Sequence, residues 1–184
     1  MLAYDIKIPK DRIAVLIGTK GKTKSEIEES MHAKIAIDSK EGDVRVTGED
    51  AVKLYAAQNI IRAIARGFNP EVALSLRKQD WAFELIDLND WHEKKNHQER
   101  MKGRVIGKGG KSREIIEELS ESSLSIYGKT VGIIAPIETI GIAKQATEML
   151  LEGANHSTVF SFLEKKRREA KRAELLGKKS RTKH

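Results

Sequence analysis

The eight-residue stretch RVIGKGGK, Arg104 to Lys111, decides how this sequence folds. Gly107 and Gly110 lie three residues apart, and the segments on either side of them carry apolar residues at helical spacing. Because glycine has no Cβ atom, the pair permits a tight turn and lets another backbone come very close. The second helix would point free N–H groups and the positive end of its dipole at the turn, which favours phosphate. The stretch therefore predicts a glycine turn between two helices, with cations placed to meet an anion.

A second copy of this device lies earlier in the chain. The stretch LIGTKGK, Leu16 to Lys22, aligns with the later one at a constant shift of 89 residues. The matched pairs include Gly18 with Gly107, Gly21 with Gly110, Lys22 with Lys111, Ile27 with Ile116, Glu28 with Glu117, Glu29 with Glu118, Ile35 with Leu124 and Ile37 with Ile126. One Gly-x-x-Gly arises easily by chance, but a pair with matching flanks indicates an internal duplication.

The duplication divides the 184 residues into two domains, each with a modest core. The expected boundaries are 1–66 for the first domain, 67–80 for a short helix and linker, 81–153 for the second domain, and 154–184 for a trailing helix and basic tail. No cysteine is present, which excludes disulfides, thiolate metal sites and a cysteine nucleophile. We see no signal peptide, and Pro136 and Glu138 interrupt the most apolar region. We expect a soluble, cytoplasmic and monomeric protein.

The net charge of +7 is concentrated at the carboxyl end. Residues 164–184 hold ten Lys or Arg and three Glu, a surplus of seven, so residues 1–163 are balanced. Basic terminal runs commonly contact nucleic acid through its phosphates, although a solvated, disordered end is the alternative.

The apolar pattern predicts the same order of elements in both halves. Strands are expected at 4–8, 34–38, 44–47, 81–88, 124–127 and 130–135, and helices on both sides of each glycine turn, at 49–66 and at 137–152. In the helix at 49–66 the apolar face consists of Val52, Ala56, Ile60 and Ile64. Residues 90–100 form a charged insertion before the second turn, and Gly128-Lys129 is a two-residue hairpin loop.

Four residues predict helix starts. Asp11 is expected to cap the first helix, and Thr23 with Glu26 a capping box on the second. Asn69 should cap a short helix that begins at Pro70. A short helix also follows the second domain, because Gly67, Asn69 and Ser75 match Gly153, Asn155 and Ser161 at a shift of 86.

Strand–helix–Gly-x-x-Gly–helix–strand–strand–helix resembles the type I KH domain. The resemblance implies an α+β fold of two tandem βααββα units, each with a three-stranded antiparallel sheet packed by three helices. It also implies that the glycine loop clamps the backbone of about four single-stranded nucleotides beside an apolar groove. The implied RNA contacts are Gly18, Thr19, Lys20, Gly21, Lys22, Lys24, Arg104, Gly107, Lys108, Gly109, Gly110, Lys111 and Arg113. The implied groove walls are Ile17, Ile27, Ile35, Ile37, Ile106, Ile116, Leu124 and Ile126, most of which also fit a core role.

Two other readings of the glycine turns are weaker. Both turns finish in Gly-Lys-Thr or Gly-Lys-Ser, but Leu16 and Val105 stand where a P-loop needs its other glycine. A helix-turn-helix for duplex DNA explains neither the glycine pairs nor the two strands that follow.

The sequence contains no catalytic or metal-binding constellation. His92 and His97 are five residues apart, one more than the spacing that places two imidazoles on one helix face. The paired glutamates after each turn resemble solvated helix faces rather than an acid–base pair. We therefore expect no enzyme activity, no cofactor and no metal.

Nearly the whole chain resembles the archaeal members of the Dim/Pno ribosome-assembly family, through its two KH units, the segment 66–71 (RGFNPE) and the basic tail. Members of this family are partners of the Nob endonuclease, which matures the 3′ end of small-subunit ribosomal RNA. Eukaryotic members carry an N-terminal extension and a degenerate first glycine loop. This chain has neither feature, so an archaeal origin is implied and the role of the first domain is more open.

Two functional hypotheses remain. The first is an RNA-binding assembly factor that acts at the 3′ end of pre-16S ribosomal RNA, and the second is a protein-interaction scaffold or another RNA chaperone. The cations around both turns favour the first. We expect the second loop to be the stronger clamp, because the first lacks the third glycine and has Val15 in place of Arg104.

Overall fold

The computed structural model describes residues 1–181 and repeats the order strand–helix–helix–strand–strand–helix twice. The first repeat consists of β1 (Leu2–Lys7), α1 (Lys10–Ile17), η1 (Thr19–Gly21), α2 (Lys22–Met31), β2 (Ala33–Asp38), β3 (Asp43–Gly48) and α3 (Ala51–Ala65), followed by α4 (Pro70–Ala73) and η2 (Leu74–Arg77). The second consists of β4 (Trp81–Asp87), η3 (Leu88–Asp90), α5 (Lys95–Ile106), η4 (Lys108–Gly110), α6 (Lys111–Ser120), β5 (Ser123–Tyr127), β6 (Thr130–Pro136), α7 (Ile137–Glu152) and α8 (His156–Arg181). The predicted α+β class with two three-stranded antiparallel sheets is confirmed.

By its internal contacts the chain divides into two compact units. Unit 1 contains residues 1–86 and 124–134, and unit 2 contains 87–123 and 135–184. Most residues of β4, β5 and β6 therefore pack in the same unit as the first repeat.

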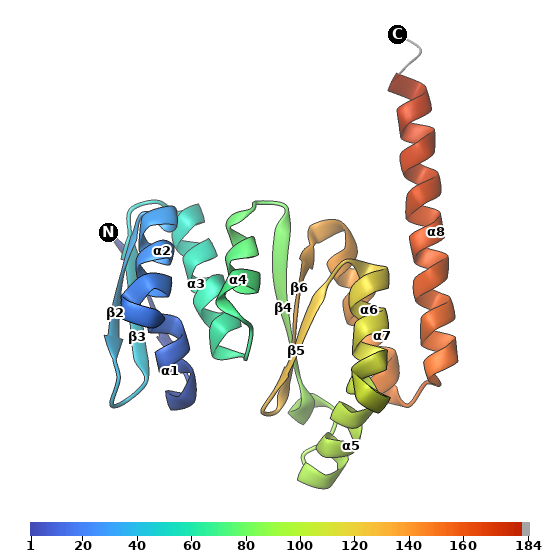
Figure 1. Cartoon of the computed structure of the whole chain (residues 1–184), viewed down its shortest axis with the longest axis horizontal. Helices are drawn as coiled ribbons and strands as arrows, with labels where there is room; N and C mark the ends of the chain where they lie inside the picture. The colour runs from blue at the N-terminus through green and yellow to red at the C-terminus, as the bar shows by residue number, and fades with distance from the viewer. Residues whose placement is uncertain (182–184) are drawn as a thin grey trace. The chain divides into compact units, whose positions relative to one another are not determined.

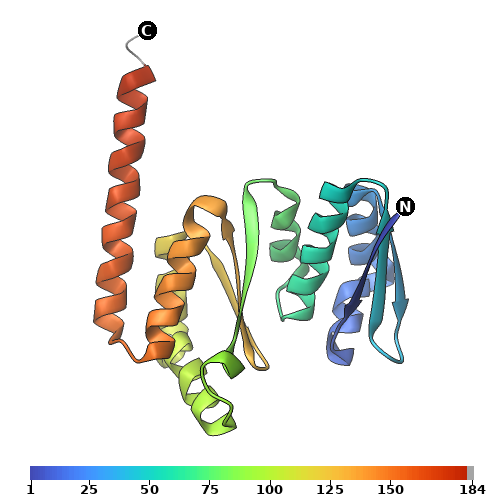
Figure 2. The ribbon, with the colours of Figure 1, turned by 180° about the vertical axis from the view of Figure 1, so that it is seen from behind.

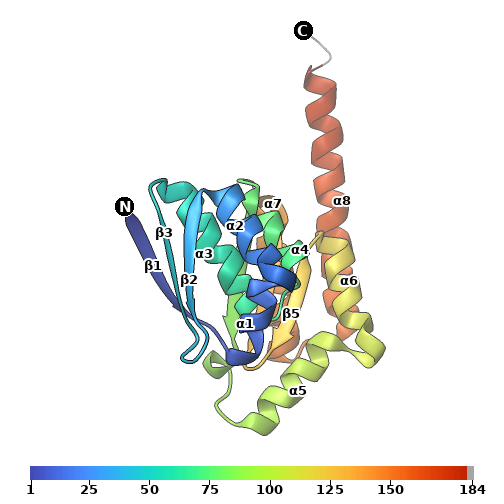
Figure 3. The ribbon, with the colours of Figure 1, turned by 60° about the vertical axis from the view of Figure 1, so that its left-hand side comes forward.

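In unit 1, the first sheet has the strand order β1–β3–β2, with Tyr4 and Ile35 both opposite Val46. Helices α1, α2 and α3 cover one face of this sheet (Figures 1 and 3). The other face is polar and exposed, and it carries the ion pairs Arg45–Asp5 (2.7 Å) and Lys7–Asp43 (3.4 Å).

Helix α3 is buried on more than one side. Val52, which the pattern assigned to the core face, is 66% exposed, whereas Ile61 and Ala63 are fully buried. The predicted single apolar face of α3 is therefore incomplete. Helix α3 packs against its own sheet, and the hydrophobic core that it joins also includes Ile134 of β6.

The residues that follow α3 pack closely on the second sheet, within the same unit. Gly67 has a φ of +93°, and a Cβ atom there would lie 2.6 Å from Ser125 Oγ. Ser125 Oγ donates to the carbonyl oxygen of Arg66 (2.7 Å), and Phe68 meets Phe83 edge to face. A Cβ atom on Gly132 would lie 2.7 Å from the Phe68 ring. Both glycines are needed for this close approach.

Two of the predicted helix starts are wrong and one is confirmed. Helix α1 begins at Lys10, so Asp11 lies inside its first turn and instead accepts a hydrogen bond from the Tyr127 hydroxyl (2.6 Å). Burial and this hydrogen bond raise the pKa of Tyr127. Helix α2 begins directly after Gly21 without a side-chain cap, so Thr23 forms no capping box. Asn69 caps α4 as predicted, accepting from Glu71 N–H at 3.1 Å.

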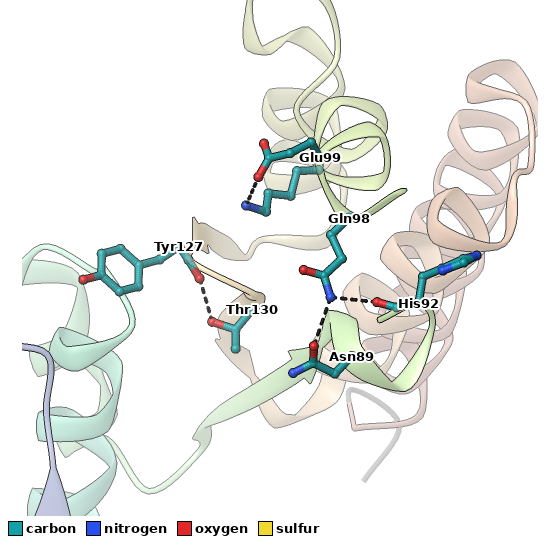
Figure 4. Close-up of polar contacts among 7 residues, drawn as sticks. Asn89, His92, Gln98, Glu99, Tyr127 and Thr130 are labelled. Atoms are coloured by element: carbon teal, nitrogen blue, oxygen red, sulfur yellow. Dashed lines mark hydrogen bonds and ion pairs between the residues drawn. The ribbon is translucent and has the colours of Figure 1, made fainter. Parts of the chain in front are cut away.

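The hairpin between β5 and β6 also matches the prediction. Gly128 and Lys129 form the loop, and Gly128 has a φ of +56°. Thr130 Oγ1 donates to the carbonyl oxygen of Tyr127 at 3.0 Å (Figure 4).

In unit 2, the expected short trailing helix is instead a helix of 26 residues. Helix α8 runs without a break from His156 to Arg181, so the greater part of the predicted basic tail is helical. Val159 and Leu163 anchor its first half and are fully buried. Residues 182–184 lie outside the described part. No helix within residues 1–181 is long and apolar enough to cross a membrane.

The charged insertion before the second turn is held by a buried amide. Gln98 is 2% exposed, and its Nε2 donates to Asn89 Oδ1 (3.0 Å) and to the carbonyl oxygen of His92 (2.7 Å) (Figure 4). Gln98 lies in the first turn of α5, which starts at Lys95, and its two hydrogen bonds connect this turn to the residues before the helix.

Replacing Gln98 with leucine should lower the free energy of unfolding by about 1–3 kcal/mol, because the two hydrogen bonds that Gln98 donates to Asn89 and His92 are both lost. Asn96→Leu, on the exposed side of the same turn, is the matched control and should change it by less than about 0.5 kcal/mol. Urea denaturation measures both. Equal stability of the Gln98→Leu variant and the wild-type protein would contradict the assigned role.

Candidate nucleic-acid interface

The two glycine loops have nearly the same backbone conformation. Their (φ, ψ) angles are Gly18 (74°, 174°), Lys20 (54°, 30°) and Gly21 (76°, 12°), against Gly107 (73°, 175°), Gly109 (59°, 24°) and Gly110 (78°, 7°). Three of the four positions in each loop thus have a left-handed or related positive φ. Such angles favour glycine, so the non-glycine Lys20 carries a local strain.

The first glycine of each loop is required by the fold. A Cβ atom on Gly18 would contact Thr23 Oγ1 and lie 2.8 Å from Thr23 N. One on Gly107 would lie 2.6 Å from Ser112 Cβ and 2.8 Å from Ser112 N. Ser112 is 2% exposed, and its hydroxyl has no hydrogen-bond partner among the described residues. The turn is therefore packed directly onto the start of the following helix.

The later glycines face open space. A Cβ atom on Gly21, Gly109 or Gly110 would meet nothing within 4 Å. Neither α2 nor α6 has a side-chain cap at its amino end, where the positive end of the helix dipole lies. Another backbone can therefore approach both loops closely, next to the positive end of a helix dipole.

The cations predicted around the loops lie mostly in solvent. Lys20, Lys22, Lys108 and Lys111 are exposed, as are Thr19 and Arg113, and Lys24 is half-buried. Arg113 lies 3.5 Å from Glu117 within α6. The lysines therefore surround each turn and are available to an anion.

Arg104 has a structural contact that the sequence did not indicate. Its Nε donates to the carbonyl oxygen of Leu150 (2.8 Å), and its Nη2 to that of Ala154 (2.6 Å), at the end of α7. In the first repeat Arg12 makes the equivalent pair, with Ile64 and Phe68 (both 2.8 Å). The predicted contrast between Arg104 and Val15 therefore fails, because Arg12, one helical turn before Val15, makes the same contacts in the first repeat.

The predicted groove residues separate into two groups. Ile27, Ile35, Ile116 and Leu124 are buried, with Ile27 and Ile116 at 0% exposure, so their side chains belong to the core. Ile17, Ile37, Ile106 and Ile126 are half-buried. In unit 1, Ile17 at the end of α1 and Ile37 on β2 both pack on the edge of the hydrophobic core. The groove prediction now depends on the four half-buried residues.

The histidine pair of the insertion is stacked. The rings of His92 and His97 are parallel within 4°, with centroids 3.9 Å apart. The neighbouring His92 charge, followed by burial, lowers the pKa of His97. Residues 1–181 contain no group of three side chains that could hold a metal ion.

Known proteins share this arrangement. The model of the eukaryotic type KH-domain (KH-domain type I) matches residues 82–168, and the general KH domain model matches residues 3–63. A KH domain-containing protein of Methanocaldococcus jannaschii is 48% identical over 181 residues, covering 95% of this chain and 79% of that protein. Dim2p from Pyrococcus horikoshii, of which a crystal structure is known, is 46% identical. The chain belongs to the archaeal Dim/Pno-type family.

Two solved structures of Dim/Pno-type proteins are similar over most of their length. The crystal structure of Dim2p from Pyrococcus horikoshii has a TM-score of 0.84 and 46% identity, covering 90% of this chain and 99% of that one. The aDim2p chain in a complex of a/eIF2alpha, aDim2p and rRNA from the same organism has a TM-score of 0.85 and 44% identity, covering 91% and 95%. The tandem KH fold expected from the sequence is therefore confirmed.

The two glycines of the second loop should differ in their tolerance of alanine. Gly107→Ala and Gly110→Ala both place a side chain at positive φ, but only the first creates a clash with α6. Gly107→Ala should therefore lower the free energy of unfolding by at least about 1 kcal/mol more than Gly110→Ala. Thermal and urea denaturation provide the measurement. Equal losses would show that Gly107 is kept for its φ alone.

Proposed function

We propose that this chain binds single-stranded RNA at its two glycine loops, without catalysis, as an assembly factor of the small ribosomal subunit. One observation carries the proposal. Both loops hold open glycines (Gly21, Gly109 and Gly110), and exposed lysines flank them at the start of an uncapped helix. A phosphodiester backbone fits such a site, because it needs close approach and positive charge at the same place.

The proposed target is the 3′ end of pre-16S ribosomal RNA. An rRNA target is supported by the similar aDim2p of Pyrococcus horikoshii, which was crystallised with rRNA. By family resemblance, the proposed partner is a Nob-type endonuclease. The proposed state is a cytoplasmic monomer. A purely protein-binding scaffold explains the fold equally well but gives no reason for Lys20, Lys22, Lys108 and Lys111 to surround both turns.

The second loop remains the proposed main clamp, for a reason that differs in part from the sequence argument. Arg104 no longer distinguishes the loops, because its guanidinium is occupied and Arg12 makes the same contacts. The remaining difference lies at the third loop position, where Gly109 leaves open space and Lys20 adds a side chain.

Exchanging both Lys108 and Gly109 for aspartate should lower RNA affinity at least tenfold, which equals about 1.4 kcal/mol. Two negative charges would stand where phosphate is expected. The site is exposed and open, so the cost to stability is limited to the strain of aspartate at the positive φ of Gly109. The matching exchange of Thr19 and Lys20 is the control and should cost less. Titration of both variants against one single-stranded RNA decides the ranking. No loss in either folded variant would remove the proposed function.

Deleting residues 165–184 should weaken binding to RNAs of different sequence by the same factor. Phosphate contacts carry no sequence information, and each lost contact should reduce the slope of log K against log salt by roughly 0.7. Affinities at several salt concentrations measure the slope. An altered sequence preference with an unchanged slope would contradict this role.

A further inference from the structure

Helix α8 packs along only part of its length. Val159 and Leu163 are fully buried, whereas the residues from Arg168 to Gly177 are exposed. Within unit 2, the helix continues well past the end of α6 (Figures 1 and 2). At 1.5 Å per residue, the 26-residue helix is about 39 Å long, and the part beyond Leu163 accounts for about 27 Å of this.

The start of α8 is fixed beside the second glycine loop. His156 Nε2 lies 2.8 Å from the carbonyl oxygen of Arg104, to which its N–H form donates. The Arg104 side chain in turn binds the end of α7, so three helices meet three residues before Gly107. In the first repeat, Pro70 occupies the position of His156 and offers no donor. Only the second repeat can therefore couple a trailing helix to its loop in this way.

A second contact braces α8 against α6. Arg167 Nη1 lies 3.9 Å from Glu118 Oε1, and Lys166 lies 3.5 Å from Glu169 and over the Phe162 ring. Two cations are thus engaged within the protein. The other four described cations of α8 are exposed and make no ion pair within residues 1–177: Lys165, Arg168, Lys171 and Arg172.

An exposed basic helix of this kind is complementary to a phosphate backbone. Helices without tertiary packing are marginal in water, and unpaired cations along one helix gain most from an anionic partner. Lys165 and Arg172 lie about 14 and 24 Å from the start of α8, measured along its axis. At about 3.4 Å per nucleotide, a stacked strand that begins at the start of α8 reaches Lys165 after about four nucleotides and Arg172 after about seven.

We infer that α8 is an arm that extends the RNA site of the second loop. RNA held at Gly107–Gly110 continues along α8, where Lys165, Arg168 and Arg172 contact its phosphates. This inference rests on the proposed function, and it adds a length requirement. An RNA of about five nucleotides fills the loop site alone. One of about fifteen also reaches the arm.

The test compares five- and fifteen-nucleotide RNAs of one sequence against four full-length proteins. The wild type is compared with a Lys165→Gln, Arg168→Gln, Arg172→Gln triple variant and with Ala170→Pro, which keeps every charge but breaks the exposed helix. A Lys34→Gln, Lys40→Gln, Lys129→Gln variant removes the same charge from exposed positions outside α8. Circular dichroism and melting temperature show that each variant is folded.

If α8 contacts RNA, the wild type should bind the longer RNA at least tenfold more tightly than the shorter one. The triple variant and Ala170→Pro should each lose at least fivefold for the longer RNA and less than twofold for the shorter. The control variant should follow the wild type. Wild-type affinity of Ala170→Pro for the longer RNA, or equal losses at both lengths, would overturn the arm while leaving the loop site intact. A folded wild type that binds neither RNA would overturn the proposed function and the arm together.

Discussion

The close contact between each glycine turn and the helix after it is the constraint on which the rest of the molecule depends. Gly18 and Gly107 turn the chain at positive φ with no room for a Cβ atom against Thr23 and Ser112. This packing fixes the direction in which α2 and α6 begin, and neither helix has a side-chain cap. The same contact that holds the fold therefore creates the seat for an anion, while Gly21 and Gly110 leave the approach open.

The two repeats attach this turn to the rest of the domain in the same manner and then diverge. Arg12 and Arg104 each bind two carbonyl oxygens at the end of the long helix, although they occupy different positions relative to the glycines. After that helix, the first repeat continues with Pro70 and a short helix, and the second with His156 and a long one. Duplication thus preserved the loop, and the trailing segments provide the difference between the two halves.

The sequence predicted the features that depend on neighbouring residues. It did not predict the side-chain contacts that depend on segments far apart in the chain. Helix α7 has the predicted bounds, and the Gly128-Lys129 hairpin and the Asn69 cap were found from neighbouring residues alone. Asp11 was misassigned because its partner is Tyr127, 116 residues away. The role of Arg104 depends on carbonyl groups some fifty residues later, which no spacing rule exposes. One sequence signal was overlooked: residues 60–65 of α3 are apolar except Arg62, more than a single stripe needs, and they share a core with Ile134 of β6.

Ultraviolet crosslinking to total cellular RNA tests the central claim most directly, because one experiment identifies both the bound RNA and the contacting peptides. The account predicts crosslinked peptides that include Gly107–Lys111, fewer from Gly18–Lys22, and RNA reads concentrated at the 3′ end of the small-subunit ribosomal precursor. Crosslinks absent from both glycine loops, or reads that merely follow the abundance of each RNA, would contradict it.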